Sequence, residues 1–213
     1  MLFDMTTLPP KERYKLLTST VVPRPIAWVV TLDGEGRRNA APFSFFNVFA
    51  SDPPVIGFSI GERPSGGNKD TMANIRAAGQ FVVCLVGEDT AAAMNVTGAE
   101  VAPGIDETVL AGLGTLPSVR VAPPRIAESP VAMECETFQI VPIGNYVLVL
   151  GRVLAMHIRD DCVLDAERHY IDSAGLKLIG RMAAPDWYVR TSDLFAMSRL
   201  SPADLAKRST ETP

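Results

Sequence analysis

Short apolar runs separated by turn-forming residues make up most of the chain, a pattern typical of antiparallel strands. β-Branched and aromatic residues dominate the runs, and Gly, Pro, Asn and Asp gather between them. Two long runs flank the Pro-Ile-Gly-Asn sequence at 142–145, which predicts a hairpin. A second hairpin is predicted around Asp-Gly-Glu-Gly at 33–36. The predicted strands span residues 26–32, 37–42, 55–60, 81–86, 131–141 and 146–158.

Helices are predicted at the margins of these strands. Near the N-terminus, two prolines precede a Lys-Glu-Arg-Tyr sequence, which is typical of a first helical turn, and this helix is expected to end near Val22. A second helix is predicted over 69–78, with Gly79 as its stop. Residues 88–114 are rich in Ala, Thr and Gly, which predicts short helices and loops outside the sheet.

This arrangement favours a mainly β fold. Only one predicted strand is closely followed by a helix, so alternating βαβ units and a doubly wound parallel sheet are disfavoured. An antiparallel sheet that closes fully or partly into a barrel accounts better for many strands joined by short turns. We expect one domain over residues 1–200 and a polar, disordered tail over 201–213, where the hydrophobic periodicity is lost.

Composition and charge exclude several classes of protein. Of 213 residues, 47% are hydrophobic and 21% are charged, as in a globular protein with a filled core. The net charge of -4 predicts no nucleic-acid partner, because clusters of Lys and Arg bind phosphate backbones. No apolar run approaches the roughly 20 residues of a membrane span, and no signal-peptide pattern opens the chain, so we expect a cytoplasmic protein without membrane contact. The three Cys and two His show no metal-ligand spacing.

The sequence Gly-Phe-Ser-Ile-Gly at 57–61 matches the GxSxG pattern of serine hydrolases, with Ser59 as the nucleophile. In those enzymes a helix follows the serine directly, whereas the Pro and Gly of residues 62–67 predict a loop. His157 or His169 would have to serve as the base of such a site. We therefore keep a hydrolase as an alternative and interpret Ser59 as a residue at the end of a strand.

A second motif, Ser-Gly-Gly-Asn-Lys-Asp-Thr at 65–71, places glycines, a cation and a hydroxyl at a predicted helix start. It is not a Walker A motif, because Asp70 separates the lysine from the hydroxyl residue. Exposed N–H groups and the helix dipole still favour an anion there, so Lys69 and Thr71 could hold a single phosphate. The alternative is a helix cap beside a solvated lysine.

Small and polar residues precede an aromatic cluster in Arg-Asn-Ala-Ala-Pro-Phe-Ser-Phe-Phe-Asn at 38–47. An isoalloxazine ring needs this mixture, because its benzene end requires apolar walls and its pyrimidine oxygens require N–H or amide donors. Small side chains also let the backbone approach such a ring. The alternative is a hairpin strand with core phenylalanines.

Several motifs carry a resemblance when they are taken together. They are Arg-Pro-Ile-Ala-Trp-Val-Val-Thr at 24–31, Asn-Ala-Ala-Pro-Phe-Ser-Phe-Phe at 39–46, Asp-Pro-Pro at 52–54, and Lys-Asp-Thr at 69–71 followed by Asn74 and Ile75. In order and approximate spacing they resemble the flavin reductase-like, FMN-binding split-barrel family. Gly-Arg-Met at 180–182, with Trp187 and Tyr188, resembles the closing segment of the family, although Met-Ala-Ala replaces its Leu-Gly-Gly part.

The resemblance implies a six-stranded antiparallel Greek-key split barrel with short peripheral helices, and a homodimer with FMN near the interface. Residues of the 39–46 stretch would contact the ring and ribityl chain, and the 59–60 pair would lie beside the ribityl or phosphate. Lys69 and Thr71 would hold the phosphate, with Arg24 as a second cation. The implied cofactor-binding residues are Arg24, Asn39, Ala40, Ala41, Ser44, Phe45, Phe46, Ser59, Ile60, Lys69, Asp70 and Thr71.

The function that the resemblance implies is an FMN-dependent NAD(P)H oxidoreductase, with NADH or NADPH as a transient co-substrate. Such a flavin reductase passes hydride or electrons through FMN and can supply a partner monooxygenase. No catalytic residue is assigned, because the cofactor carries the electronic chemistry. The sequence has no GxGxxG after a strand, so the nicotinamide would have to stack on the open flavin face. The alternative in the same pocket is a flavoredoxin-like electron carrier, or an FMN-binding protein without NAD(P)H activity.

Overall fold

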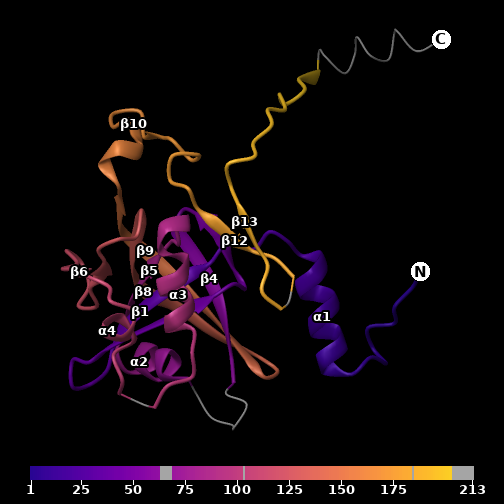
Figure 1. The fold of residues 1–213 in the computed structure, drawn as a ribbon, viewed down its shortest axis with the longest axis horizontal. Helices are drawn as coiled ribbons and strands as arrows, with labels where there is room; N and C mark the ends of the chain where they lie inside the picture. The colour runs from indigo at the N-terminus through magenta and orange to yellow at the C-terminus, as the bar shows by residue number, and fades with distance from the viewer. Residues whose placement is uncertain (63–68, 103, 184, 203–213) are drawn as a thin grey trace.

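A seven-stranded antiparallel sheet forms the body of the computed structural model, which describes residues 1–62, 69–102, 104–183 and 185–202 (Figure 1). The strand order is β2-β1-β5-β8-β9-β4-β3. These strands are β1 (Ala27–Leu32), β2 (Arg38–Phe43), β3 (Phe46–Ser51), β4 (Pro54–Gly61), β5 (Gln80–Cys84), β8 (Val131–Ile143) and β9 (Tyr146–Ile158).

In the described part of the chain, helices and small two-stranded sheets surround this body. Helix α1 stands beside the β12–β13 hairpin, and the β10–β11 hairpin projects from the body (Figure 1). The helices are α1 (Pro10–Thr20), α2 (Asp70–Ala78), α3 (Ala91–Thr97) and α4 (Glu107–Leu110), with 3-10 turns at Glu88–Thr90 and Asp160–Cys162. The short strands are β6 (Thr115–Leu116), β7 (Arg125–Ile126), β10 (Val163–Asp165), β11 (Tyr170–Ile171), β12 (Ile179–Arg181) and β13 (Tyr188–Arg190).

The hairpin of β8 and β9 confirms the strongest prediction from the sequence. Each strand has 13 residues. The pairing of Ile143 with Tyr146 leaves only Gly144 and Asn145 in the turn, so the turn is shorter than the predicted 142–145 segment. Gly144 has a φ of 57°, a left-handed conformation that glycine adopts without a Cβ clash.

The central strands of the sheet are buried on both faces, and successive side chains of a strand point to opposite sides, so they enter two different cores. In β1, Val29 packs in one core with Phe58 and Phe81, whereas Trp28 and Val30 pack in the other. Each of these five side chains is fully buried. The continuous apolar run of β1 is therefore explained by two cores, and not by a single half-exposed face.

Helix α2 confirms the helix predicted over 69–78 and closes one core with Met72 and Ile75. It ends as the sequence predicts, because Gly79 has a φ of 67° and donates its N–H to the carbonyl of Ile75. The described residues of the 88–114 segment form the expected short helices and loops. No helix in the described ranges is long and apolar enough to span a bilayer.

The sheet has one strand more than the six expected. The additional strand is β3, which is not among the strands predicted from the sequence. Val48 and Phe49 are exposed, and the strand exists because it pairs with β4. β3 is an edge strand of the sheet, so one of its sides lacks a strand neighbour in the described part of the chain. The predicted tail over 201–213 lies almost wholly outside the described residues.

Candidate functional site

A pocket of about 200 Å³ opens where β2, the start of α2 and the segment after α3 meet. β2 contributes the Asn39 amide and small or apolar side chains, and α2 contributes its first turn. The lining residues are Asn39, Ala41, Pro42, Phe43, Lys69, Asp70, Thr71, Thr97, Gly98, Ala99, Glu100, Val101 and Glu107.

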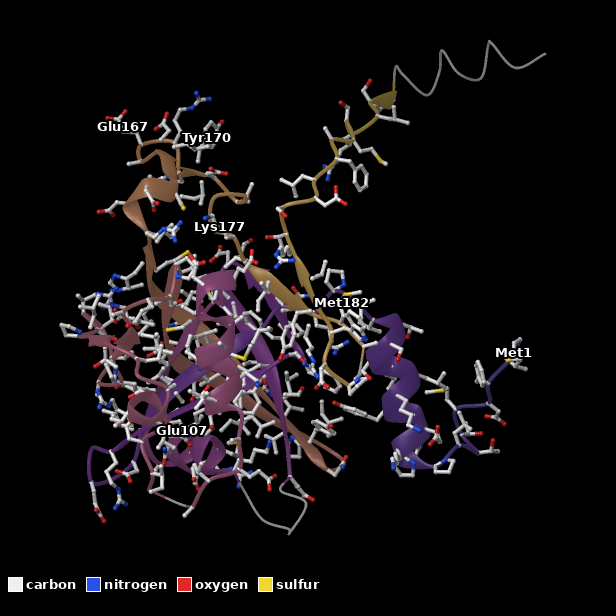
Figure 2. The ribbon with its side chains drawn as sticks, viewed as in Figure 1. Met1, Glu107, Glu167, Tyr170, Lys177 and Met182 are labelled. Atoms are coloured by element: carbon white, nitrogen blue, oxygen red, sulfur yellow. The ribbon has the colours of Figure 1, made fainter. Side chains whose placement is uncertain are left out.

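A buried carboxyl group, that of Glu107, anchors one wall of this pocket. Glu107 is the first residue of α4 and is only 5% exposed (Figure 2). Its Oε1 accepts a hydrogen bond from Asn39 Nδ2 at 2.8 Å, and its Oε2 accepts one from the Ala40 N–H at 3.0 Å. Burial raises the pKa of the Glu107 carboxyl above its ordinary value, and these hydrogen bonds offset part of that effect.

The hydrogen bonds continue from Asn39 into the first turn of α2. Thr71, which is 1% exposed, donates its hydroxyl to Asn39 Oδ1 at 2.8 Å. Thr31 approaches the same oxygen at 3.4 Å and accepts a hydrogen bond from Asn74 Nδ2 at 3.0 Å. The wall is thus a connected chain of polar groups that runs from α4 across β2 to α2.

The cation of the pocket among its described lining residues is Lys69. Its Nζ lies 5.9 Å from the centre of the Phe43 ring, close enough for a cation–π contact. Lys69 occupies the N-cap position of α2, so its backbone stands at the positive end of the helix dipole. Both features favour an anionic group at this end of the pocket.

A second pocket of about 230 Å³ lies on the other side of Pro42 and Phe43, which line both pockets. Ser44 from the end of β2 and Arg181 and Tyr188 from the β12–β13 hairpin contribute to it. The Arg181 guanidinium lies over the Tyr188 ring at 4.6 Å and donates to the carbonyl of Pro185. The hairpin therefore covers this end of β2.

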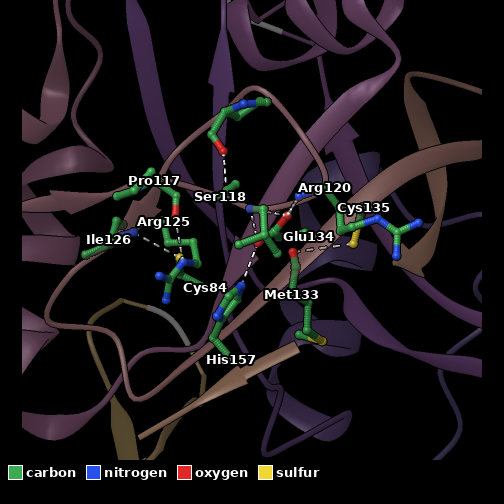
Figure 3. A network of polar contacts seen from close by, with 12 residues as sticks. Cys84, Pro117, Ser118, Arg120, Arg125, Ile126, Met133, Glu134, Cys135 and His157 are labelled. Carbon is green, nitrogen blue, oxygen red and sulfur yellow. Dashed lines mark hydrogen bonds and ion pairs between the residues drawn. The ribbon is translucent and has the colours of Figure 1, made fainter. Parts of the chain in front are cut away.

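A second buried carboxyl group, that of Glu134, lies on β8 away from these pockets (Figure 3). The side chain is fully buried and accepts hydrogen bonds from the N–H groups of Val119 and Arg120, the shortest at 2.6 Å. His157 Nε2 of β9 lies 2.6 Å from Oε1. Burial raises the pKa of Glu134, but these hydrogen bonds together bring it below its ordinary value. Glu134 ties the 117–124 loop onto the sheet.

The model of the flavin reductase like domain matches residues 18–173. The chain belongs to the flavin reductase-like family. An uncharacterized protein of Deinococcus radiodurans is 46% identical over 94% of this chain and 90% of its own length. The crystal structure of nitrilotriacetate monooxygenase component B from Bacillus cereus is similar, with a TM-score of 0.87 and 32% identity over 92% of this chain and 98% of that chain. An NADH:FMN oxidoreductase of Rhodococcus qingshengii is 30% identical over 62% of this chain and 64% of its own length.

Every residue that lines the first pocket falls within the family match. The structure brings five of the residues predicted for the cofactor to this pocket, and Ser44 lines the second. Ala40 is fully buried and reaches the first pocket wall through its N–H bond to Glu107. The five are Asn39, Ala41, Lys69, Asp70 and Thr71.

The other predicted residues lie outside the lining of these two pockets. Arg24 is 7% exposed and its guanidinium donates to the backbone carbonyls of Thr18, Val21 and Met182, with Ser44 Oγ at 3.4 Å. It therefore joins α1 to the segment after β12. Phe45 stacks on Tyr146 with 5.7 Å between ring centres. The remaining three belong to strands: Phe46 to β3, and Ser59 and Ile60 to β4.

The context of Ser59 differs from that of a hydrolase nucleophile. Ser59 lies inside β4, paired with Leu148, and not at a turn from a strand into a helix. Its N–H donates to the Phe45 carbonyl. His157, one of the two bases considered for it, is engaged with Glu134.

Sequence reasoning missed Glu107 and the 97–101 segment of the pocket. Asp106 accepts hydrogen bonds from Thr108 and Val109, which marks a helix start. Nothing in the local pattern links this turn to Asn39, which is 68 positions away. The 97–101 segment is similarly placed by tertiary contacts, because Gly98 lies against the Pro42 ring of β2.

Proposed function

We propose that this protein binds FMN across the two pockets on either side of Pro42 and Phe43 and transfers electrons from NADH or NADPH through it. The observation that carries this proposal is the position of Lys69, at the start of α2 and in the lining of a pocket that β2 also lines with Asn39, Ala41, Pro42 and Phe43. Membership of the flavin reductase-like family supports the choice of ligand.

The residues present fit a phosphorylated flavin. The two pockets share a wall, and together they reach the range of roughly 300–1,000 Å³ that small-molecule sites occupy. Ala41, Gly98 and Ala99 have side chains small enough to let a flat ring approach the backbone. The ammonium group of Lys69 and the N-terminus of α2 would hold the phosphate. The predicted residues outside the pocket lining, including Arg24 and Ser59, are proposed to hold the strands and segments that form the site in position.

The protein's own contribution is binding and placement. A bound flavin would supply the two-electron chemistry with the reduced nicotinamide. The β2 backbone and Asn39 would orient the flavin, and the β12–β13 hairpin, through Arg181 and Tyr188, would exclude water from the second pocket. Backbone N–H groups near Ser44 would stabilise negative charge that develops on the ligand. No protein acid or base is assigned to the reaction.

The assembly that we propose is a homodimer of split barrels, with the flavin near the interface. Support comes from exposed apolar side chains such as those of Tyr14 and Leu17 on α1 and Phe49 on β3. A partner monooxygenase is proposed as the acceptor, because the similar Bacillus cereus protein is a monooxygenase component.

The experiment that tests the function is the visible spectrum of the purified protein during titration with FMN, followed by anaerobic NADH and NADPH. We expect a bound-flavin spectrum that one of the nucleotides bleaches. A bound flavin that neither nucleotide bleaches would contradict the reductase and favour the electron carrier. No flavin binding at all would overturn the proposal.

A substitution tests the phosphate position. Lys69→Ala removes the cation at the start of α2, and we expect the dissociation constant for FMN to rise about tenfold while that for riboflavin, which lacks the phosphate, changes little. Lys11→Ala on α1 is the matched control, since Lys11 is exposed. Equal losses for FMN and riboflavin would contradict the assignment.

A further inference from the structure

The Glu107 carboxylate decides the orientation of the Asn39 amide. An ionised carboxylate only accepts hydrogen bonds, so the group 2.8 Å from its Oε1 must be the N–H side of Asn39. The opposite orientation would place two acceptor oxygens against each other. The Asn39 Oδ1 therefore faces α2, where it accepts the hydroxyl proton of Thr71.

In this orientation of Asn39, the single hydroxyl proton of Thr71 is used in the hydrogen bond to Asn39 Oδ1. The Thr71 Oγ1–Asn39 Oδ1 distance of 2.8 Å is that of a good O–H···O hydrogen bond. A hydroxyl has one donor and two acceptor lone pairs, so Thr71 can offer only acceptor capacity to the pocket that it lines. The same holds for Glu107, whose two oxygens each accept one hydrogen bond and have room for others.

The charges of the residues that line the first pocket also favour a ligand group that donates hydrogen bonds. Asp70, Glu100 and Glu107 are acidic, whereas Lys69 is the basic residue among the described lining residues. A phosphate dianion carries only acceptor oxygens and negative charge, so Thr71 and Glu107 would repel it. Hydroxyl groups, in contrast, can donate to both side chains.

We propose that the Glu107–Asn39–Thr71 chain makes the buried end of the pocket a hydrogen-bond acceptor that recognises hydroxyl groups on the polyol chain of the ligand. The inference rests on the proposed function and refines it. Lys69 holds the phosphate, and Thr71 Oγ1 accepts from a ribityl hydroxyl instead of donating to the phosphate. Glu107 acts as a positioning residue, because it fixes Asn39 and, through it, the Thr71 proton.

The first test compares FMN with lumiflavin, which has the same ring with a methyl group in place of the ribityl phosphate. Thr71→Val keeps the shape of the side chain and removes the hydroxyl, with both its acceptor lone pairs and its hydrogen bond to Asn39 Oδ1. We expect the dissociation constant for FMN to rise about three- to tenfold, the change that corresponds to one hydrogen bond, with that for lumiflavin unchanged. Flavin fluorescence measures both. Thr90→Val is the matched control, because Thr90 is 6% exposed and its hydroxyl donates to the Gly87 carbonyl.

The second test reverses the polarity of the wall. In Glu107→Gln, the Ala40 N–H still needs an acceptor, so the oxygen of the new Gln side chain is expected to face Ala40 and its nitrogen to face Asn39. Asn39 is then expected to turn its oxygen toward residue 107 and its N–H toward Thr71. The Thr71 hydroxyl is then free to donate into the pocket. We expect FMN to bind less tightly and inorganic phosphate to compete with FMN several-fold better than in the unsubstituted protein.

The outcomes separate this inference from the proposed function. If the unsubstituted protein binds no FMN, both fail. If it binds FMN but Thr71→Val weakens FMN and lumiflavin equally, or leaves FMN unchanged, the hydroxyl site fails and the FMN site stands. Unchanged phosphate competition in Glu107→Gln would also overturn the role of Glu107, whatever the stability of Thr71→Val.

Discussion

The two buried glutamates, Glu107 at the pocket and Glu134 under the 117–124 loop, show how the same side chain serves different purposes. Both are nearly inaccessible to solvent, at 5% and 0% exposure. The pKa of Glu107 is raised by burial, whereas that of Glu134 is lowered because its hydrogen bonds outweigh its burial. Glu134 receives the N–H groups of Val119 and Arg120 and contacts His157, while Glu107 receives Asn39, the Ala40 N–H and its own backbone N–H.

The difference lies in how fully each charge is satisfied. A buried carboxylate surrounded by donors stabilises the structure that supplies them, here the loop and the β8–β9 hairpin. A buried carboxylate whose lone pairs are not all hydrogen-bonded costs free energy of folding. A ligand that donates a hydrogen bond to it, or a proton that neutralises it, removes part of this cost. The comparison assigns Glu134 to the scaffold and Glu107 to the wall of the pocket that we propose as the ligand site.

The largest expected effect comes from Glu134→Ala. It leaves two backbone N–H groups and His157 without their acceptor, so the free energy of unfolding should fall by about 3 kcal/mol or more. Urea denaturation measures this loss. The dissociation constant for FMN should remain within about twofold at temperatures where the variant is folded, because Glu134 lies outside the pocket lining. Weaker flavin binding by the folded variant would break the division of roles.

An intermediate effect is expected in the pH dependence of stability. Since the pKa of Glu134 is lowered in the folded protein, its contribution to the free energy of unfolding is present at pH values above the ordinary pKa of a glutamate. That contribution is lost as the pH falls through the lowered pKa. Since the pKa of Glu107 is raised in the folded protein, its contribution to the free energy of unfolding is present at pH values below the ordinary pKa of a glutamate. That contribution is lost as the pH rises through the raised pKa.

The two Gln variants therefore have opposite pH profiles. With rising pH, Glu134→Gln should become less stable relative to the unsubstituted protein, and Glu107→Gln more stable. Urea denaturation between acidic and neutral pH checks both signs. Parallel profiles would contradict the contrast between the two sites.

The smallest effect is expected for Arg152→Ala. Arg152 and Glu136 form an ion pair at 3.4 Å on the same two strands as Glu134 and His157, but both side chains are almost half exposed. Exposed pairs contribute little because water screens them, so the free energy of unfolding should change by less than about 0.5 kcal/mol. A loss close to that of Glu134→Ala would show that position on β8–β9, and not burial, decides the effect.

Much of the fold could be predicted from the local pattern of apolar and turn-forming residues. The β8–β9 hairpin, the β1 strand and helix α2 follow from runs and stop signals that lie within a few residues of one another. The edge strand β3 was missed, because its hydrogen bonds come from β4 and its exposed Val48 and Phe49 give no alternating pattern. An edge strand of this kind depends on its neighbour more than on its own residues.

The candidate site divides in the same way. Asn39, Lys69 and Thr71 could be selected from the sequence because their motifs are local and together resemble one family, which the family match confirms. Their use as cofactor ligands stays a prediction. The orientation of Asn39 could not be selected, because it depends on a carboxylate 68 positions further along the chain.

The sequence by itself determined most strands, the main turns and the stop of α2, since these depend on side-chain periodicity and on the conformational preferences of single residues, and its motifs indicated the family. Only the tertiary structure decided the roles of the two glutamates. In the sequence, both have another acidic residue close by, Asp106 next to Glu107 and Glu136 two positions after Glu134, and nothing there distinguishes their roles. The balance between burial and hydrogen bonding around each carboxylate, which the fold sets, raises the pKa of one and lowers that of the other.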